Sequence, residues 1–240
     1  MQAFILAAGL GTRLRPMTDH IPKALVEVQG QPLLKIAIDK LIRQGVTRIV
    51  VNVHHFADKV CQYLQQQQWD VPIFISNERE ELLDTGGGLK KAEPFFSADE
   101  PILIHNVDIL SRLNISELHS KHVDSMTLAT LVVGKRETSR YLLFDAQGQL
   151  TGWKNKHTGE SKWVQSPIQN YQELAFDGIA LIEPQLLGLL PPPTGPYPII
   201  PAYLKIARNH RINYFELNSK DWLDVGKPQT LSQAQLWKLS

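Results

Sequence analysis

The first half of the chain alternates between short apolar runs and stretches whose apolar residues recur at helical spacing. Runs rich in apolar or β-branched residues at 4–8, 47–53 and 71–76 predict buried strands. The stretches between them, 31–44 and 57–68, predict helices. Strands and helices that alternate at this pitch indicate parallel βαβ units and a three-layer α/β architecture.

The second half continues the alternation and adds an antiparallel signal. Segments 141–145 and 149–153 flank Ala146-Gln147-Gly148, which is typical of a hairpin turn. This hairpin would make the sheet mixed and add a β-rich insertion. The polar stretch 158–173 has little periodicity and predicts a mobile loop. Further strands are expected at 101–104, 125–133, 175–182 and 212–217, and further helices at 115–122, 199–208 and 228–237.

Three consecutive glycines at 86–88 interrupt the pattern after a charged segment. Glycine is unfavourable inside a helix, but it lets the backbone approach a ligand closely. We therefore expect a ligand-facing loop over 77–89, followed by a helix over 89–95.

One domain is expected over residues 1–240. The proline-rich segment 191–196 resembles an interdomain linker, but only about forty-five residues follow it, fewer than a domain usually needs. We interpret it as an extended surface loop.

Composition narrows the class of partner. The chain has 43% hydrophobic residues and a net charge of +1, so bulk electrostatics give no reason to expect a nucleic acid or a membrane surface as partner. No apolar run approaches the length of a membrane span. The single cysteine, Cys61, excludes an internal disulfide and fits a reducing compartment, so we expect a soluble cytoplasmic protein. A homo-oligomer is compatible with the sequence, which does not define the oligomeric state.

A glycine-bearing segment follows the first strand and predicts a polyphosphate site. Gly9, Gly11 and Thr12 lead into Arg13, and Lys23 follows ten residues later. Glycines let backbone N–H groups approach an anion, and consecutive loop amides form a concave nest for phosphate oxygens. Arg13 adds a planar fork and Lys23 a mobile point charge.

Other interpretations of this segment are weaker. The dinucleotide fingerprint needs a third glycine where Leu14 stands, and Glu27 and Asp39 are poorly placed as its ribose-binding acid. The Walker motif does not occur. A glycine turn without a ligand would not explain the cations Arg13 and Lys23 so close together.

Asp108 is the first candidate for binding a cation. It comes just after a buried strand, at the edge of an open α/β sheet where ligands bind. A carboxylate is costly to bury there unless it meets a cation. Magnesium fits, because it prefers a few carboxylates together with phosphate oxygens and water.

The string LAAGLGTRLRPMT, followed by PKALVEV and QPLL, resembles the signature of the sugar nucleotidyltransferase family. These enzymes join a nucleoside triphosphate to a sugar 1-phosphate. The resemblance implies a Rossmann-like three-layer fold with a mixed, mainly parallel sheet and a β-rich sugar-binding insertion. Residues 1–110 would bind the nucleotide and residues 111–240 the sugar phosphate.

The resemblance also implies roles for individual residues. Arg13 and Lys23 would be catalytic, and Asp224, in WLDVGKP, would join Asp108 in holding Mg²⁺. The nucleotide-binding set would be Leu6, Ala8, Gly9, Gly11, Thr12, Arg13, Glu78, Thr85 and Gly86. The sugar-phosphate set would be Lys23, Asn155 and Gly178.

Two departures from the family pattern affect these roles. Val107 stands where the metal-binding segment of the family has glycine, and Asn155 replaces a common sugar-contacting carboxylate.

Glu78 could accept a hydrogen bond from a ring N–H of uracil or guanine. UTP or GTP with a hexose or amino-sugar 1-phosphate is therefore expected. A phosphocholine-type cytidylyltransferase and a catalytically silent sensor of nucleotide sugars are the alternatives.

Overall fold

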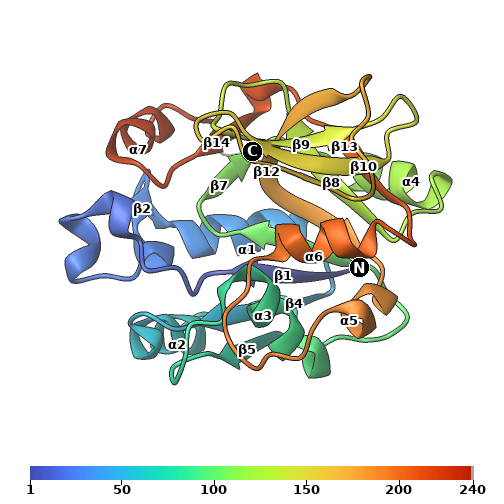
Figure 1. The fold of residues 1–240 in the computed structure, drawn as a ribbon. Helices are drawn as coiled ribbons and strands as arrows, with labels where there is room; N and C mark the ends of the chain where they lie inside the picture. The colour runs from blue at the N-terminus through green and yellow to red at the C-terminus, as the bar shows by residue number, and fades with distance from the viewer. Residues whose placement is uncertain (239–240) are drawn as a thin grey trace.

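The computed structural model describes residues 1–238, and a ten-stranded mixed sheet forms its centre (Figure 1). Strands β6, β1, β4 and β5 lie side by side and parallel (Ile102–Asn106, Gln2–Leu6, Arg48–Val53 and Ile73–Asn77). The β-branched runs that predicted strands make up this buried half. The predicted α/β class and mixed sheet are confirmed.

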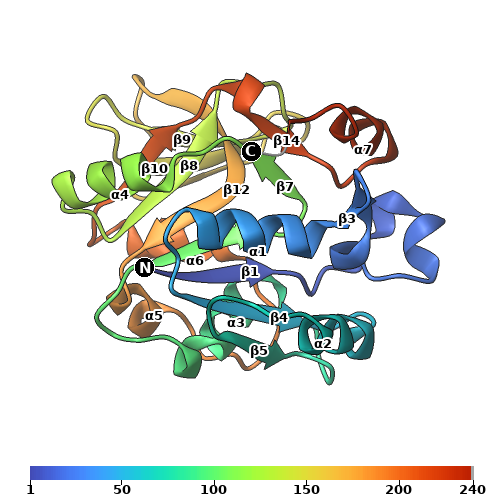
Figure 2. The ribbon, with the colours of Figure 1, turned by 180° about the vertical axis from the view of Figure 1, so that it is seen from behind.

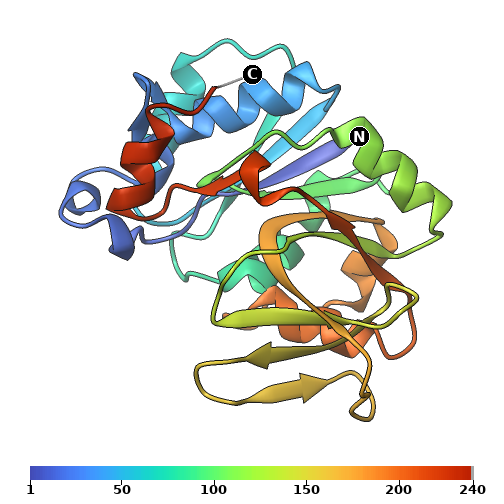
Figure 3. The same cartoon turned by 90° about the horizontal axis from the view of Figure 1, so that it is seen from above.

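The long strand β12, Gln172–Ile182, joins these parallel strands to the rest of the sheet, where most of the pairs are antiparallel. On one side it pairs with β8, Ala129–Gly134, which in turn pairs with β13, Ile212–Glu216. Its first residues pair with the predicted hairpin, which is confirmed as β9, Arg140–Phe144, and β10, Leu150–Asn155. Figure 3 shows this hairpin projecting at one end of the molecule.

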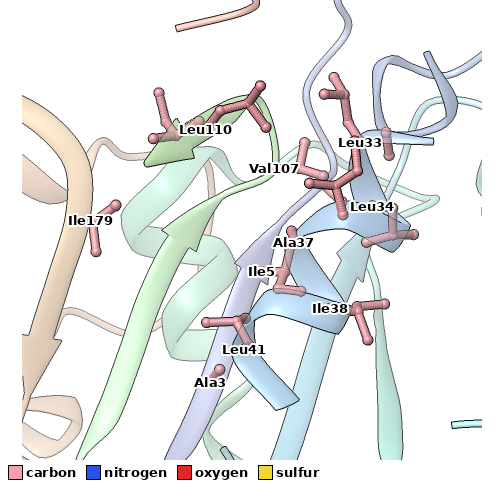
Figure 4. Packing of buried hydrophobic residues seen from close by; sticks show 14 of the residues in the cluster. Ala3, Ile5, Leu33, Leu34, Ala37, Ile38, Leu41, Val107, Leu110 and Ile179 are labelled. Atoms are coloured by element: carbon pink, nitrogen blue, oxygen red, sulfur yellow. The ribbon is translucent and has the colours of Figure 1, made fainter. Parts of the chain in front are cut away.

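Helices cover both faces of the parallel strands (Figures 1 and 2). On one face, α1 (Leu33–Arg43) and α2 (Ala57–Gln66) pack over residues such as Ile5. Figure 4 shows Leu34, Ile38 and Leu41 of α1 against Ala3 and Ile5 of β1. On the other face lie α3 (Asp84–Lys91), α5 (Gln185–Leu189) and α6 (Ile199–Ile206). The remaining helices are α4 (Ile115–Asp124) and α7 (Pro228–Ala234). No helix within residues 1–238 has both the length and the apolar character needed to cross a membrane.

Several short elements were not predicted. Strand β11, Ser161–Trp163, lies inside the stretch expected to be a loop, because it extends the hairpin by pairing with β10. Two-stranded ladders also form between β2 (Glu27–Val28) and β3 (Gln31–Pro32), and between β7 (Ile109–Ser111) and β14 (Trp222–Asp224). Their strands are too short to give a periodic signal.

The prediction that the three glycines form a loop was wrong. Gly86, Gly87 and Gly88 lie inside α3, and the expected helix therefore starts earlier, at Asp84. Each glycine faces a close neighbour: the ring of Tyr197 at Gly86, the Gly195 carbonyl at Gly87, and the side chain of Glu78 at Gly88. The absence of Cβ atoms serves tight packing of the helix against these neighbours.

Asp177 forms a buried brace between β12 and β14. Its Oδ1 accepts from Arg136 Nε at 3.1 Å, while Oδ2 is buried without a hydrogen-bond partner. The Arg136 guanidinium lies 3.9 Å from the ring centroid of Trp222, whose Nε1 donates to the Asp177 carbonyl oxygen. Burial raises the pKa of Asp177 to about 7, although Arg136 acts in the opposite direction.

We predict that Gly88→Ala destabilises the protein. A Cβ at residue 88 would lie 2.6 Å from Glu78 Oε1 and 3.0 Å from Asn52 Nδ2. We expect a loss of about 1–3 kcal/mol in the free energy of unfolding, measured by urea denaturation. Gly188→Ala is the matched control, because a Cβ at that position in α5 meets nothing within 4 Å. That variant should be unchanged or gain up to about 1 kcal/mol. Equal effects at the two positions would contradict the packing explanation.

We also predict that Asp177 makes stability depend on pH. Below about pH 3 the carboxyl is largely protonated in both the folded and the unfolded states. As the pH rises towards 7, the unfolded chain loses this proton first, so the contribution of Asp177 falls by up to about 1.4 kcal/mol per pH unit. The side-chain amide of the Asp177→Asn variant cannot ionise. The free energy of unfolding of this variant, relative to wild type, should therefore rise between pH 5 and pH 8 in urea titrations. A constant difference would show that Asp177 is ionised throughout.

Candidate active site

The candidate site lies at the carboxyl ends of β1 and β6. The Val107 amide donates to the Leu6 carbonyl at 3.2 Å and continues the pairing of these strands. Asp108 follows, and its carbonyl oxygen accepts from the Val225 amide at 2.9 Å. In the β7–β14 ladder, Asp224 stands opposite Ile109. Backbone hydrogen bonds thus bring the two predicted metal ligands together from distant parts of the chain.

Arg13 and Lys23 lie between these carboxylates. Arg13 Nη1 is 3.1 Å from Asp224 Oδ2, and its Nη2 is 3.4 Å from Asp108 Oδ2. Lys23 Nζ contacts the same Asp108 oxygen. Asp108 and Lys23 are largely buried, whereas the Arg13 side chain is 49% exposed. The structure therefore brings all four residues predicted as catalytic or metal-binding into one cluster.

The charges of this cluster set the ionisation of Asp224. Burial raises the pKa of its carboxyl, but the Gly226 amide and the Arg13 guanidinium outweigh burial. The net effect holds the pKa of Asp224 below its ordinary value. Asp224 is therefore a carboxylate at neutral pH, as a cation-binding site requires.

Gly226 is a site residue that the sequence analysis missed. Its amide donates to Asp224 Oδ1 at 2.8 Å. A Cβ at this position would lie 2.7 Å from Asp108 Oδ2 and 2.8 Å from Asp224 Oδ1. Only glycine leaves room for the two carboxylates to converge. Its position directly after Asp224-Val225 was the available signal.

The loop after β1 presents open backbone amides. Among residues 1–238, the N–H groups of residues 9–13 have no hydrogen-bond partner. Gly11 has a φ of 68°, and its carbonyl accepts from the Thr18 hydroxyl at 2.8 Å. A Cβ at Gly11 would lie 2.9 Å from Thr18 and 3.2 Å from the Cβ of Lys23. The loop is thus packed against the segment that carries Lys23, with amides free for an anion.

Asn52, on β4, was also missed. Its Oδ1 accepts from the amides of Ala7 at 2.7 Å and Ala8 at 3.2 Å. These bonds end β1 at Leu6, although the apolar run continues to Ala8. An asparagine inside an otherwise β-branched strand was the signal for this role.

Glu78 lies apart from the charged cluster. It is fully buried, and its carboxylate accepts from Asn52 Nδ2 at 2.7 Å and from the Leu83 amide at 3.1 Å. Burial raises its pKa, while these two bonds lower it. A base edge could reach Glu78 only after one of these contacts opened. In this structure Glu78 supports Asn52, and through it the loop amides.

Thr85 and Gly86 connect α3 to the segment before α6. Thr85 Oγ1 accepts from the Ile199 amide at 2.9 Å, and the Gly86 amide donates to the Tyr197 carbonyl at 2.9 Å. An amide at the start of α6 thus donates to a side chain of α3, and an amide at the start of α3 donates to a carbonyl just before α6. Thr85 and Gly86, predicted to bind the nucleotide, therefore lie where the start of α3 is hydrogen-bonded to the start of α6.

The predicted sugar-phosphate residues lie in different places. Gly178 has a φ of 74°, and a Cβ there would lie 2.6 Å from Asn106 Nδ2 and 3.3 Å from Ile109 Cγ1, on either side of Asp108 in the chain. Asn155 lies at the end of β10, where its side chain accepts from the amides of His157 and Thr158. Gly178 therefore adjoins the charged cluster, whereas the Asn155 side chain shapes a turn.

No group of three or more His, Cys, Asp or Glu side chains within residues 1–238 is arranged to hold a metal ion. Asp108 and Asp224 are two neighbouring carboxylates whose oxygens contact Arg13, Lys23 and the Gly226 amide in this structure. Magnesium is usually bound by one or two carboxylates together with substrate phosphates, so this donor set fits it.

The sequence matches the Nucleotidyl transferase family over residues 2–239. N-acetylmuramate alpha-1-phosphate uridylyltransferase of Caulobacter vibrioides is 30% identical, over 97% of this chain and 95% of that relative. Mannose-1-phosphate guanyltransferase of Aspergillus oryzae is 31% identical over 95% of this chain, which spans only 62% of that longer protein. The solved structure of UDP-glucose pyrophosphorylase from Acinetobacter baumanii has a TM-score of 0.78 at 17% identity, covering 98% of this chain and 92% of that one. The chain therefore belongs to the nucleotidyl transferase family and is a sugar nucleotidyltransferase, as its glycine loop and Pro22-Lys23 motif predicted.

Proposed function

We propose that the chain transfers a nucleoside monophosphate from UTP or GTP to a hexose or amino-sugar 1-phosphate, giving a nucleoside diphosphate sugar and pyrophosphate. The names of the two relatives, a uridylyltransferase and a guanyltransferase, support this pair of donors. Residues 1–110 would bind the nucleotide and residues 111–240 the sugar phosphate.

The convergence of Arg13, Lys23, Asp108 and Asp224 beside open loop amides carries this proposal. Two cations and two carboxylates at the edge of a parallel sheet are suited to reactions between phosphates. A protein that only sensed nucleotide sugars would not need all four groups.

In the proposed reaction, an oxygen of the sugar 1-phosphate attacks the α-phosphorus of the triphosphate. The bond between the α-phosphorus and the α–β bridging oxygen breaks, and pyrophosphate leaves with the electron pair. The attacking oxygen is already anionic, so no general base is needed. The barrier comes from repulsion between the two polyanions and from charge on the leaving oxygen. Positioning and electrostatic stabilisation therefore carry the catalysis.

Arg13 and Lys23 supply the positive charge in this mechanism. Arg13, together with the amides of residues 9–12, would stabilise the leaving pyrophosphate, and Lys23 would span the reacting phosphates. Both cations rest against aspartates here. The half-exposed Arg13 can exchange its carboxylate partners for phosphate oxygens by a side-chain rotation.

Asp108 and Asp224 would hold Mg²⁺ in the substrate-bound enzyme. When bound, the ion would supply charge neutralisation and orientation of the α-phosphate. The lowered pKa of Asp224 keeps this carboxylate ionised for that role.

A matrix of nucleoside triphosphates against acceptors tests the proposal directly. We expect pyrophosphate release with UTP or GTP and a sugar 1-phosphate in the presence of Mg²⁺. Activity only with CTP and phosphocholine would replace this function by that of a cytidylyltransferase. Silence with all acceptors, together with measurable binding of a nucleotide sugar, would identify a sensor.

We predict that Asp108→Asn, Asp224→Asn and Arg13→Ala each lower kcat by roughly a hundredfold or more, because the first two each remove a proposed ligand of Mg²⁺ and the third removes a cation that would face the phosphates. Asp124→Asn is the matched control, since Asp124 is an exposed residue at the end of α4. Its turnover should equal that of wild type, and all four variants should keep the wild-type circular dichroism spectrum. Wild-type turnover in any of the three site variants would remove that residue from its proposed role.

A further inference from the structure

The ladder that carries Asp224 lies outside the main sheet. Within residues 1–238, strands β7 and β14 pair only with each other, over three residues each. Two isolated strands of this length are marginally stable at best. The approach of Asp224 to Asp108 therefore depends on contacts that fix β7 from outside the ladder.

Backbone hydrogen bonds close this ladder at its two ends. The Val225 amide donates to the Asp108 carbonyl oxygen at 2.9 Å, and the Arg112 amide donates to the Asp221 carbonyl oxygen at 2.8 Å. Ser111, the last residue of β7, stands directly before the second of these bonds. A contact that fixes Ser111 therefore fixes one end of the ladder, and Asp108 precedes the other.

Lys40, in the last turn of α1, makes such a contact. Its Nζ donates to the Ser111 carbonyl oxygen and, at 2.6 Å, to Ser111 Oγ. Among residues 1–238, Lys40 has no carboxylate partner. A lysine near the end of a helix is favoured by the helix dipole even when its ammonium stays in water. The ammonium of Lys40 is instead directed at β7.

This placement is unfavourable for the charge itself. Burial, and to a smaller extent the charge of Arg43, lowers the pKa of Lys40 to about 8. The side chain is still mostly protonated at neutral pH, and an ammonium carries three N–H donors. Lys40 can therefore hold both oxygens of Ser111 at once.

Lys40 is not placed to touch a substrate. It lines a cavity of about 20 Å³ between α1 and β7, whose walls include Ile36, Ala37, Ile109 and Leu110. Sites for small molecules usually measure roughly 300 Å³ or more. The apolar contacts around this cavity are non-directional, whereas hydrogen bonds fix a position along the strand. Lys40 therefore acts on the backbone of β7.

We propose that Lys40 is a positioning residue of the transferase. By fixing Ser111 it sets the position of β7 and, through the β7–β14 ladder, the placement of the Asp224 carboxylate beside that of Asp108. The effect on catalysis rests on the proposed function, because it assumes the roles given there to the two aspartates. The effect on the ladder rests on the hydrogen bonds alone.

Hydrogen exchange tests the ladder without any substrate. In Lys40→Met, an unbranched side chain without a donor replaces the lysine. We expect the Val225 and Arg112 amides to exchange about tenfold faster or more in this variant, while amides of β1 in the main sheet keep their rates. Lys35→Met is the matched control on the same helix, because Lys35 pairs with Asp39. Unchanged exchange at both ladder amides, or equal acceleration in β1, would overturn the inference.

Turnover gives a second readout, measured well below the Tm of each variant with a triphosphate and an acceptor that wild type uses. We expect kcat of Lys40→Met to fall roughly tenfold or more, because small displacements of groups around the reacting atoms are costly. KM for the triphosphate should stay within about twofold, since the glycine-bearing loop is unaltered. Lys35→Met should match wild type. A lower Tm with wild-type kcat in Lys40→Met would reduce Lys40 to a stabilising residue.

A double-mutant cycle tests whether Lys40 acts through Ser111. Ser111→Ala removes one of the two acceptors and should lower kcat less than Lys40→Met does. The double variant should have the kcat of Lys40→Met alone, because the hydroxyl has no function once the ammonium is gone. Losses that multiply in the double variant would show that Lys40 acts elsewhere.

These outcomes are distinct from a failure of the proposed function. If wild type turns over no triphosphate with any acceptor, the proposed function fails, and the exchange rates still decide whether Lys40 holds the ladder. If wild type is active and the ladder amides exchange faster in Lys40→Met without a change in kcat, the positioning role is wrong and the transferase reaction stands.

Discussion

Two carboxylates that converge on one point constrain much of the structure. Asp108 and Asp224 would repel each other if nothing neutralised them, and Arg13 and Lys23 provide that neutralisation. Their approach requires the β7–β14 ladder to fix the backbone and Gly226 to leave the space between them empty. In the proposed function, the cations that pair with carboxylates in this structure would pair with phosphate oxygens once substrate is bound.

A further set of hydrogen bonds holds the backbone just before the glycine-bearing loop of this cluster. Asn52 ties the end of β1 to Glu78, and Glu78 packs against the bare backbone of Gly88 in α3. Contacts therefore run without a break from the Ala7 amide through Asn52 and Glu78 to Gly88 in α3. The loop at residues 9–13 is open to solvent, but Ala7 and Ala8, directly before it, are held by the buried side-chain amide of Asn52.

The sequence was sufficient for the parts of the fold that repeat a simple period. The strands of the parallel half, α1 and the β9–β10 hairpin followed from apolar spacing and turn residues. Arg13, Lys23 and Asp108 were predicted from their residue types and from their positions after predicted strands, whereas Asp224 was predicted from a motif that resembles a known family; the structure brings all four together. Residues that act through contacts distant in sequence were not found. Asn52 and Gly226 matter because of what lies opposite them in space. The glycine triplet was misinterpreted because propensity cannot reveal that Tyr197 and Glu78 need the room.

Strand β12 pairs with different strands along its length. Its residues 172–174 pair with β9, and its residues 179–182 pair with β6, so the strand changes partner at 175–178. In this stretch, Phe176 lines a cavity of about 430 Å³ between the β9–β11 strands and α6. Gly178, two residues later, lies against the Asn106 side chain, near the charged cluster. Residues 176 and 178 therefore belong to one continuous strand, so a substitution that displaces the backbone at one of them is expected to be felt at the other.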